Sequence, residues 1–361
     1  MTPELVALGW DGHVAANLAA EAPELEAGRI LSEERGLFSV ATMTGEAPAS
    51  PSGRLRHDAE FDPTAPWPAV GDWVALDPGP PGAHRLIQKV LPRRTAVVRR
   101  APGDRRLPAQ VLATNVDAAF VVSSMNAEFN PRRLERYLAV AWESGATPIV
   151  LLTKADLVAD VDSYVTAAMA VAPGVEIIAA SSVSGLGIET VRAHLGVGRT
   201  VVFIGSSGVG KSSVVNALAG RPLLDTGGIR EDDARGRHTT TRRQLVRLVD
   251  GLLIDTPGLR ELGVMDAEGV ATAFDDVEST AASCRFTDCS HRSEPGCAVR
   301  AALATGELRH ERLDAYNKLQ REAQRAALAT DAVARRAERK RWSAIHKRVG
   351  LHMKAKYGVE R

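Results

Sequence analysis

The sequence predicts an α/β domain built on a parallel sheet, preceded by a small β-barrel and followed by a helical segment that carries cysteines. Three observations support this fold class. A glycine-rich segment at residues 205–213 lies between an apolar run that predicts a buried strand and a run that predicts a helix. Short, partly alternating apolar runs separated by Gly and Pro occupy residues 36–91. All three cysteines fall within residues 284–297, ahead of a helical C-terminal region.

The composition is typical of a globular protein of two or three domains. The chain has 361 residues, of which 45% are hydrophobic and 25% are charged, and its formal net charge is +1. Bulk charge therefore indicates no particular partner. Apolar runs are shorter than the roughly 18 residues of a membrane span, and we expect neither a signal peptide nor a membrane partner. The few, clustered cysteines favour a reducing, cytoplasmic location.

The N-terminal region is predicted to contain a helix and then a barrel of the oligonucleotide/oligosaccharide-binding (OB) type. Residues 14–25 have helical spacing, and strands are expected at residues 37–41, 53–56, 70–76 and 85–91. Six arginines make the barrel a candidate RNA-binding module: Arg54, Arg56, Arg93, Arg94, Arg99 and Arg100. The alternative is a barrel that only packs against its neighbour.

After a linker at residues 101–108, strands alternate with helices, which predicts a largely parallel sheet covered on both faces. Strands are expected at residues 118–122, 148–152, 175–180, 200–204, 244–249 and 252–254. Helices are expected at residues 131–142, with Asn130 as the cap, after Asp156, at 188–195 and at 212–218. Ligands of such sheets bind at the carboxyl ends of the strands.

The glycine-rich segment is predicted to be a phosphate-binding loop. Its sequence, GSSGVGKSS, fits the G-x-x-x-x-G-K-[ST] spacing between a strand and a helix. Glycines let successive backbone N–H groups surround an anion, and the helix N-terminus adds partial positive charge. Lys211 is expected to reach the outer phosphates, and the Ser212 hydroxyl to bind Mg²⁺. The predicted nucleotide-binding residues are Gly205, Ser206, Ser207, Gly208, Val209, Gly210, Lys211, Ser212 and Ser213.

Segments at three other strand ends predict that the nucleotide is GTP. Asp255 and Gly258, in the sequence DTPG, can hold Mg²⁺ indirectly and place an N–H near a γ-phosphate. The Asp156 carboxylate can accept hydrogen bonds from N1–H and the 2-amino group of guanine, which adenine lacks. It belongs to a segment similar to N-K-x-D, formed by Thr153, Lys154, Ala155 and Asp156. Thr153 replaces the usual Asn, and its hydroxyl can keep one of the hydrogen bonds by which that Asn would hold neighbouring segments of the site together. Ser181 and Ser182 begin a segment that resembles the one supporting the base.

A threonine-rich segment at residues 235–241 is predicted to be the switch that senses the γ-phosphate. One threonine should complete the Mg²⁺ shell. We favour Thr240, with Thr239 and Thr241 as alternatives. Leu259 stands where Ras-like enzymes carry a water-orienting glutamine. Either His238 acts as the catalytic residue that positions the water, or a partner supplies the missing group, and we expect slow intrinsic hydrolysis.

The four ligands of a structural zinc ion are predicted in the spacing C-x₄-C-x-H-x₅-C: Cys284, Cys289, His291 and Cys297. Three thiolates and an imidazole make a closed tetrahedral set. Free cysteines in a loop are the alternative. Beyond Val299 the chain is predicted to be helical, and basic residues around Trp342 favour RNA phosphate as a partner over a merely solvated helix face.

The order of the motifs differs from that of ordinary GTPases, because the base-recognition segments precede the phosphate loop. The same fold results if the chain is circularly permuted. This order, the zinc spacing and segments such as Leu8-Gly9-Trp10-Asp11, Arg133-Leu134-Glu135-Arg136-Tyr137-Leu138 and Lys340-Arg341-Trp342 resemble the bacterial small ribosomal subunit biogenesis GTPases. The resemblance spans nearly the whole chain.

This resemblance implies a GTP hydrolase that acts late in maturation of the 30S ribosomal subunit. It implies stimulation by that subunit and contact with 16S rRNA through the barrel and zinc domains. We expect a monomer with an N-terminal extension and barrel at residues 1–107, a circularly permuted P-loop GTPase domain at 108–270, and a helical zinc-binding domain with a basic tail at 271–361.

Two other functions can be separated from this one by experiment. A P-loop kinase or ATPase would bind ATP as well as GTP. A non-catalytic RNA-binding protein with a nucleotide switch would show no turnover in the presence of 30S subunits.

Overall fold

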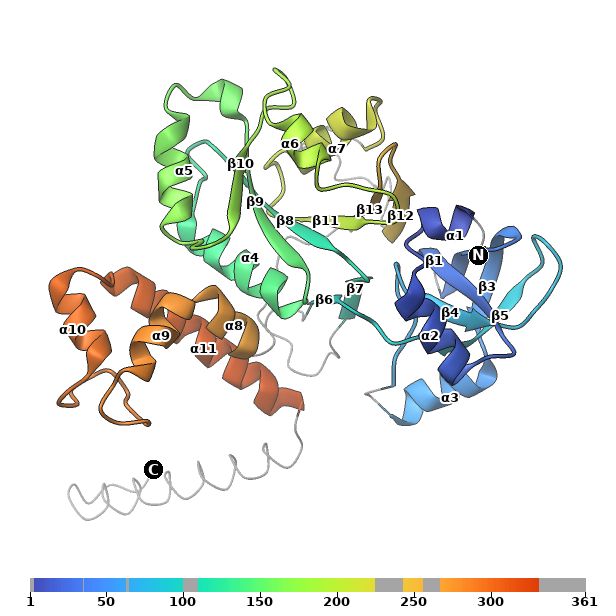
Figure 1. Cartoon of the computed structure of the whole chain (residues 1–361), viewed down its shortest axis with the longest axis horizontal. Helices are drawn as coiled ribbons and strands as arrows, with labels where there is room; N and C mark the ends of the chain where they lie inside the picture. The colour runs from blue at the N-terminus through green and yellow to red at the C-terminus, as the bar shows by residue number, and fades with distance from the viewer. Residues whose placement is uncertain are drawn as a thin grey trace, which may run out of the picture.

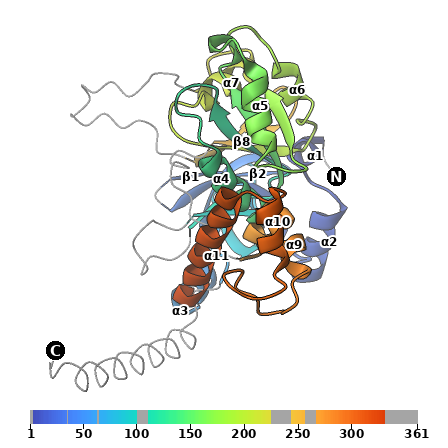
Figure 2. The same ribbon diagram turned by 90° about the vertical axis from the view of Figure 1, so that its left-hand side faces the viewer.

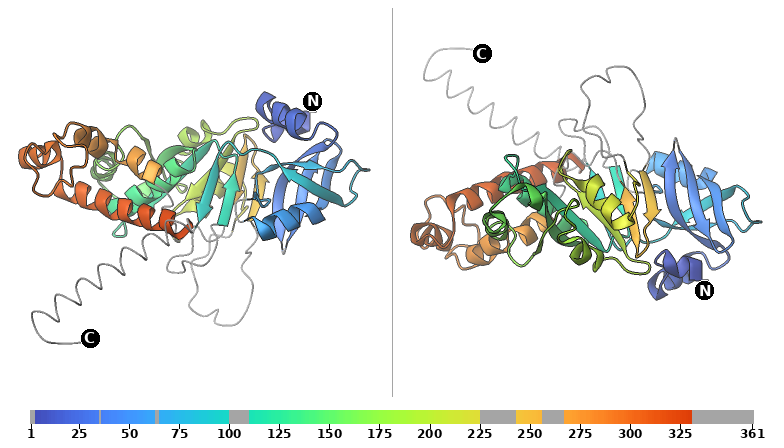
Figure 3. Two further views of the ribbon diagram at one scale, coloured as in Figure 1. Left: turned by 90° about the horizontal axis from the view of Figure 1, so that it is seen from below. Right: turned by 90° about the horizontal axis from the view of Figure 1, so that it is seen from above.

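The computed structural model describes residues 3–34, 36–62, 65–99, 110–224, 243–255 and 267–330. These residues form three parts arranged in a row: a barrel at one end, a sheet with its helices in the middle, and a helical module at the other end (Figure 1). Figure 3 shows the same row from below and from above. Within the described ranges, no helix has both the length and the apolar character needed to cross a membrane.

The N-terminal part is a closed barrel in the strand order β1-β2-β3-β5-β4, with β4 pairing back onto β1. Its strands are β1 (Glu26–Glu34), β2 (Leu37–Thr42), β3 (Gly45–Pro51), β4 (Trp73–Leu76) and β5 (Arg85–Val90). Three helices flank them: α1 (Pro3–Ala7), α2 (Gly12–Glu21) and α3 (Gly53–Phe61). The barrel predicted from the turn-separated apolar runs is therefore present.

Three details of the barrel differ from the prediction. Residues 53–56 were expected to be a strand but form the start of α3. Ser52 explains the helix, because its hydroxyl accepts a hydrogen bond from Leu55 N at 3.2 Å and so caps the first turn. Strand β3 was not predicted, and neither was strand β1. Residues 27–32 are all buried, so this strand has no alternating pattern to detect.

The middle part is a six-stranded sheet in the order β10-β9-β8-β11-β13-β12, parallel except for β12. Its strands are β8 (Ala118–Ser124), β9 (Thr147–Thr153), β10 (Glu176–Ala179), β11 (Thr200–Ile204), β12 (Arg243–Arg247) and β13 (Leu252–Asp255). A separate ribbon of β6 (Ala96–Arg99) and β7 (Gln110–Thr114) connects it to the barrel. From β8 the chain continues to β9 on one side of the β8–β11 pair, and from β11 it continues toward β13 on the other side. Ligands of such sheets bind where the direction changes, so the expected ligand site is at the carboxyl ends of β8 and β11.

Helices cover both faces of the sheet, as predicted. On one face, α6 (Ile188–Arg192) and α7 (Lys211–Ala219) pack against a cluster that includes Phe120 and Phe203. On the other face, α4 (Pro131–Glu143) and α5 (Val161–Met169) join the main core, and a short 3₁₀ helix, η1 (Ala155–Leu157), follows β9. Neighbouring residues of each strand alternate between the two clusters, so strand residues are buried on both sides.

Barrel and central sheet are hydrogen-bonded into one continuous sheet of 11 strands. Strand β12 pairs antiparallel with β1, with Ser32 opposite Gln244 and Glu33 opposite Arg243. The Arg243 guanidinium also lies 3.9 Å from the Glu33 carboxylate. Backbone pairing thus fixes the barrel to the edge strand that precedes β13 in the chain.

The C-terminal module is helical, as predicted, with α8 (Ala267–Ala273), α9 (Asp275–Ala282), α10 (Ala298–Thr305) and α11 (His310–Thr330). Figure 2 looks onto this end of the molecule and shows α11 close to α10. Arg312 of α11 is 4% exposed and joins the module to α4, since it donates to Asp276 at 2.8 Å and to Glu135 at 3.0 Å. The linker at residues 101–108 and the basic tail near Trp342 lie outside the described residues.

Candidate nucleotide site and metal centre

The glycine-rich loop follows β11 at the carboxyl end of the central sheet and leads into α7. Gly208 and Gly210 have φ values of +77° and +96°, a region that L side chains rarely adopt. Gly210 is the N-cap of α7, and no side chain caps this helix. The first N–H groups of α7 thus face the loop with the partial positive charge of the helix end, which is a geometry that suits an anion.

Lys211 lies folded over this loop. Its Nζ donates to the carbonyl oxygen of Gly205 at 2.7 Å and to that of Ser206 at 2.5 Å. The ammonium group is therefore held at the first turn of the loop. Binding of a phosphate would require the amine to exchange these carbonyl oxygens for phosphate oxygens.

Thr153, at the end of β9, is tied directly to the loop. Its side chain is 2% exposed, and its hydroxyl donates to the carbonyl oxygen of Val209. A Cβ added at Gly210 would lie 3.4 Å from the same hydroxyl, an ordinary contact distance, so it is the positive φ of +96° and not lack of space that favours glycine here. The threonine that replaces the usual asparagine therefore does make one hydrogen bond that holds the loop to β9.

The two segments expected to hold the base lie together at the ends of β9 and β10. Oδ1 of Asp156 accepts a hydrogen bond from the Ser181 hydroxyl at 2.5 Å. Ser181 is fully buried, and its Oγ also accepts from the N–H groups of Val183 and Ser184. Asp156 itself is exposed. The carboxylate is thus oriented by a buried hydroxyl while it stays accessible to a ligand.

Asp255 ends β13, the strand that pairs with β11 on the side of the phosphate loop. Burial raises the pKa of this carboxyl above its ordinary value, and the positive charge of Lys211 partly offsets the shift. Lys211 and Asp255 are therefore electrostatic neighbours. Carboxylate and hydroxyl oxygens are ligands of the kind that Mg²⁺ accepts.

Several predicted site residues lie outside the described part of the chain. These are His238, Thr239, Thr240, Thr241, Gly258 and Leu259. Their roles in the switch, in Mg²⁺ binding and in water orientation stay predictions.

The predicted metal ligands converge between α9 and α10. Ligand atoms of Cys284, Cys289, His291 and Cys297 all lie within 4.8 Å of one another. Cys284 Sγ is 3.9 Å from Cys297 Sγ, and His291 Nδ1 is 3.6 and 3.5 Å from these two sulfurs. A tetrahedral zinc ion with ordinary bond lengths separates two sulfurs by about 3.8 Å and sulfur from nitrogen by about 3.5 Å. The cluster therefore has the chemistry and the spacing of a Cys₃His metal site.

The start of α10 favours the thiolate form of Cys284, whereas burial raises the pKa of Cys289 to about 11. Cys297 is the N-cap residue, and its sulfur accepts from Arg300 N at 3.4 Å. Burial raises the pKa of Cys284, but the backbone N–H groups of Val299 and Ala298 lower it, and the net shift is downward. Metal ions bind the thiolate, so the helix N-terminus supports the site.

Two residues that touch the phosphate loop were not predicted. Nη1 of Arg133 donates to the Ser206 hydroxyl at 3.1 Å, and the Tyr137 hydroxyl lies 3.2 Å from the same oxygen. Both belong to α4. Because α4 follows β8 and β8 pairs with β11, the first turns of α4 lie at the same sheet edge as the loop. Residues 133–138 belong to a segment that resembles the family, but only the strand order places the first turns of α4 beside the loop.

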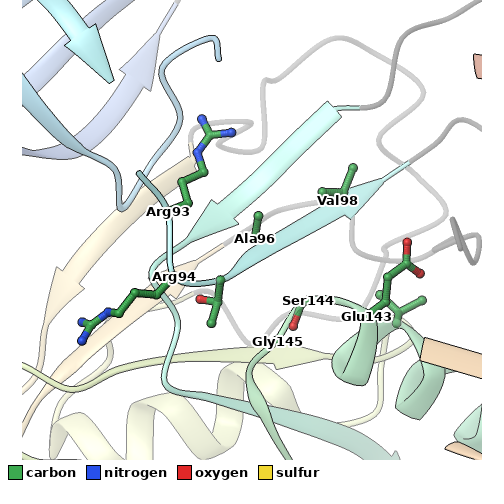
Figure 4. Close-up of a pocket in the computed structure, with 9 residues that line it drawn as sticks. Arg93, Arg94, Ala96, Val98, Glu143, Ser144 and Gly145 are labelled. Carbon is green, nitrogen blue, oxygen red and sulfur yellow. The ribbon is translucent and has the colours of Figure 1, made fainter. Parts of the chain in front are cut away.

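A pocket of about 410 Å³ lies between β6 and the C-terminal end of α4 (Figure 4). It includes none of the residues of the nucleotide or metal sites. Both of its arginines are paired, Arg93 with Asp72 at 2.7 Å and Arg94 with Asp11 at 2.6 Å. The pocket is thus separate from the candidate sites.

The fold and the arrangement of these sites define a circularly permuted GTPase with a barrel before it and a metal-binding helical module after it. A profile described as "RsgA GTPase" matches residues 90–265. The small ribosomal subunit biogenesis GTPase RsgA of Streptomyces avermitilis is 46% identical over 366 residues, covering 99% of this chain and 95% of that protein. The chain therefore belongs to the RsgA GTPase family and is a GTP hydrolase.

Two solved structures share this fold. The crystal structure of YjeQ from Thermotoga maritima has a TM-score of 0.61 and 26% identity, and the match covers 83% of this chain and 98% of that one. YloQ, described as a circularly permuted GTPase, has a TM-score of 0.58 at 24% identity, with coverage of 83% and 95%. The predicted fold class is confirmed.

Proposed function

We propose that this GTPase acts late in the maturation of the 30S ribosomal subunit and that the subunit stimulates its hydrolysis of GTP. The observation that carries the proposal is the match along nearly the whole chain to relatives named small ribosomal subunit biogenesis GTPase RsgA. The presence of Leu259 in place of a water-orienting glutamine supports a need for stimulation.

The proposed nucleotide site combines the phosphate loop with the segments at the ends of β9, β10 and β13. In this site Asp156 selects guanine, Lys211 binds the outer phosphates, and Asp255 and Gly258 contact the Mg²⁺ shell and the γ-phosphate. Mg²⁺ is bound by Ser212 and Thr240, and His238 or the ribosome positions the water. The tie between Thr153 and Val209 supports this assignment because it joins the base end of the site to the phosphate end.

The proposed ion of the Cys₃His cluster is a structural zinc. Four protein ligands close the coordination shell, so the ion stabilises the fold and takes no part in hydrolysis. We further propose that the barrel and the zinc module contact 16S rRNA, that the protein is a monomer, and that its domains divide near residues 107 and 270.

Hydrolysis of GTP measured with and without purified 30S subunits tests this function. We expect 30S subunits to raise kcat at least tenfold, and 50S subunits to leave it unchanged. The Asp156→Asn variant serves as the specificity control. Its amide can donate to the 2-oxo group of xanthine, so we expect it to lose GTP and to accept XTP. No change of rate with 30S subunits would contradict the proposed function, and equal binding of ATP and GTP would contradict the proposed site.

A further inference from the structure

The first turn of the phosphate loop is held by two side chains of α4. Both Arg133 Nη1 and the Tyr137 hydroxyl lie within hydrogen-bond distance of Ser206 Oγ, at 3.1 and 3.2 Å. Arg133 and Tyr137 are four residues apart on α4, so they lie on one face of the helix, one turn from each other. The Ser206 hydroxyl is therefore anchored by two groups from the same rigid element.

Helix α4 is itself held in place from several directions. The Asn130 side chain caps its first turn by accepting from Arg132 N at 2.9 Å and Arg133 N at 3.3 Å. On the side facing the C-terminal module, Glu135 is 1% exposed and binds Arg312 at 3.0 Å. A further ion pair joins Arg136 to Glu322 at 2.6 Å. These contacts hold α4 in place independently of its contacts with the loop.

We propose that Arg133 and Tyr137 are positioning residues for nucleotide binding, acting through the hydroxyl of Ser206. The proposal rests on the assignment of residues 205–213 as the phosphate loop. Lys211 bonds to the Ser206 carbonyl, and a phosphate must draw the lysine away from it. The side-chain bonds of Ser206 do not involve that carbonyl, so they keep the first turn in place during the exchange. A loop that is already ordered loses less entropy on binding.

The expected effect is on affinity and not on the chemical step. Binding of fluorescent GDP and of a non-hydrolysable GTP analogue to the full chain is measured together with steady-state hydrolysis. We expect Arg133→Ala to weaken the binding of both nucleotides about tenfold. Tyr137→Phe removes only a hydroxyl from a buried ring, so it should weaken their binding about threefold. Arg133→Lys keeps one charged donor and should recover most of the loss. KM rises accordingly, while kcat at saturating GTP stays within about twofold.

A double-mutant cycle decides whether the effect passes through Ser206. In a Ser206→Ala background, Arg133→Ala should change the dissociation constants less than about twofold. An undiminished tenfold loss in that background would overturn the proposal, because Arg133 would then act without Ser206.

The matched control is Arg132→Ala, which removes the same charge one residue away, from a side chain that binds Glu135 instead. A loss equal to that of Arg133→Ala would also overturn the proposal, since it would reflect general charge alone. If Lys211→Ala leaves GDP binding intact, the assignment of the phosphate loop fails instead. That result is distinct from every outcome of the Arg133 series.

Discussion

The guanidinium of Arg29, in strand β1 of the barrel, donates from Nη2 to Oγ1 of Thr200, the first residue of the strand that leads to the phosphate loop, at 2.8 Å. Its nitrogens also donate to the carbonyl oxygens of Leu8, Gly71 and Asn115. The side chain is 1% exposed. Burial lowers the pKa of Arg29 to about 10, so the group remains charged at neutral pH. One buried cation thus joins the N-terminal segment, the barrel and the central sheet.

Removal of this cation should destabilise the whole protein. Arg29→Ala removes the hydrogen bonds to four acceptors, one of which, the Gly71 carbonyl, keeps a bond from Asn115 Nδ2 at 3.0 Å. We expect the free energy of unfolding to fall by about 3–5 kcal/mol. Urea denaturation followed by circular dichroism measures the change. The control is Arg54→Ala, whose side chain is 89% exposed and which should change stability by less than about 0.5 kcal/mol. Equal stability of the two variants would contradict the role of Arg29.

Thr153 provides a test of the hydrogen bond to Val209 that joins the end of β9 to the phosphate loop. Thr153→Val keeps the side-chain volume but removes the hydroxyl, and it leaves the Val209 carbonyl without this buried donor. We expect the affinity for GDP to fall about tenfold. Titration with fluorescent GDP checks this, with Thr147→Val at the exposed start of β9 as the control. Unchanged affinity in Thr153→Val would show that the loop does not need the tie.

Asp255 should destabilise the protein at neutral pH in the absence of Mg²⁺ and nucleotide. Its folded-state pKa is raised by burial, so folding favours the protonated carboxyl. The cost of the charged form is therefore absent below the ordinary carboxyl pKa of about 4 and develops as pH rises through the folded-state pKa. We expect Asp255→Asn to raise the melting temperature at pH 7, with a gain that vanishes in acid.

The same substitution should weaken Mg²⁺-dependent GTP binding, because it removes the carboxylate charge. Thermal denaturation between pH 3 and pH 8, without nucleotide, follows the gain in stability. A gain that is independent of pH would argue against titration of Asp255 as its cause.

Glu294 organises the loop that carries the metal ligand His291. Its carboxylate accepts hydrogen bonds from the Ser290 side chain and from the N–H groups of Ser290, Arg292 and Ser293. The Ser290 hydroxyl, followed by backbone N–H groups that include those of Ser290 and Ser293, holds the pKa of Glu294 well below its usual range. The stabilisation is therefore present above the ordinary carboxyl pKa and is lost as pH falls through the folded-state value.

We expect Glu294→Ala to weaken zinc binding about tenfold at pH 7, because the loop must then be ordered by the ion alone. Competition with a chromogenic chelator measures the affinity. Glu307→Ala, an exposed glutamate beyond α10, is the control. If both variants bind zinc as tightly as the unmodified chain, the hydrogen bonds of Glu294 do not support the site.

Local sequence predicts the central strands well because each is a continuous apolar run between turn residues, as in β11 and β8. It fails for β1, whose residues are buried on both sides without alternation, and for α3, which begins at the Ser52 cap. It also misses Arg133 and Tyr137. Their contacts with Ser206 join residues 73 and 69 positions apart, and no local pattern encodes such a separation.

The four residues of the Cys₃His cluster, by contrast, are recognisable from the sequence, because all of them lie in one short segment with a spacing typical of metal sites. The segments expected to hold the base are recognised from their motifs, whereas the hydrogen bond from Ser181 to Asp156 depends on the pairing of β9 with β10. Residues His238 and Thr240 lie outside the described part of the chain, so their roles are known only as predictions.

Because β1 pairs with β12, one edge of the barrel stays uncovered for part of the synthesis of the nascent chain. The five barrel strands have been synthesised once residue 90 is made, but the edge of β1 at Ser32 and Glu33 is covered only by residues 243 and 244. At about 5–20 residues per second, translation separates the two events by about 8–30 s. During that interval the nascent barrel presents an uncovered strand edge on which another chain could add. Acidic side chains at Glu33 and Glu34 oppose such pairing, so they protect the barrel until β12 arrives.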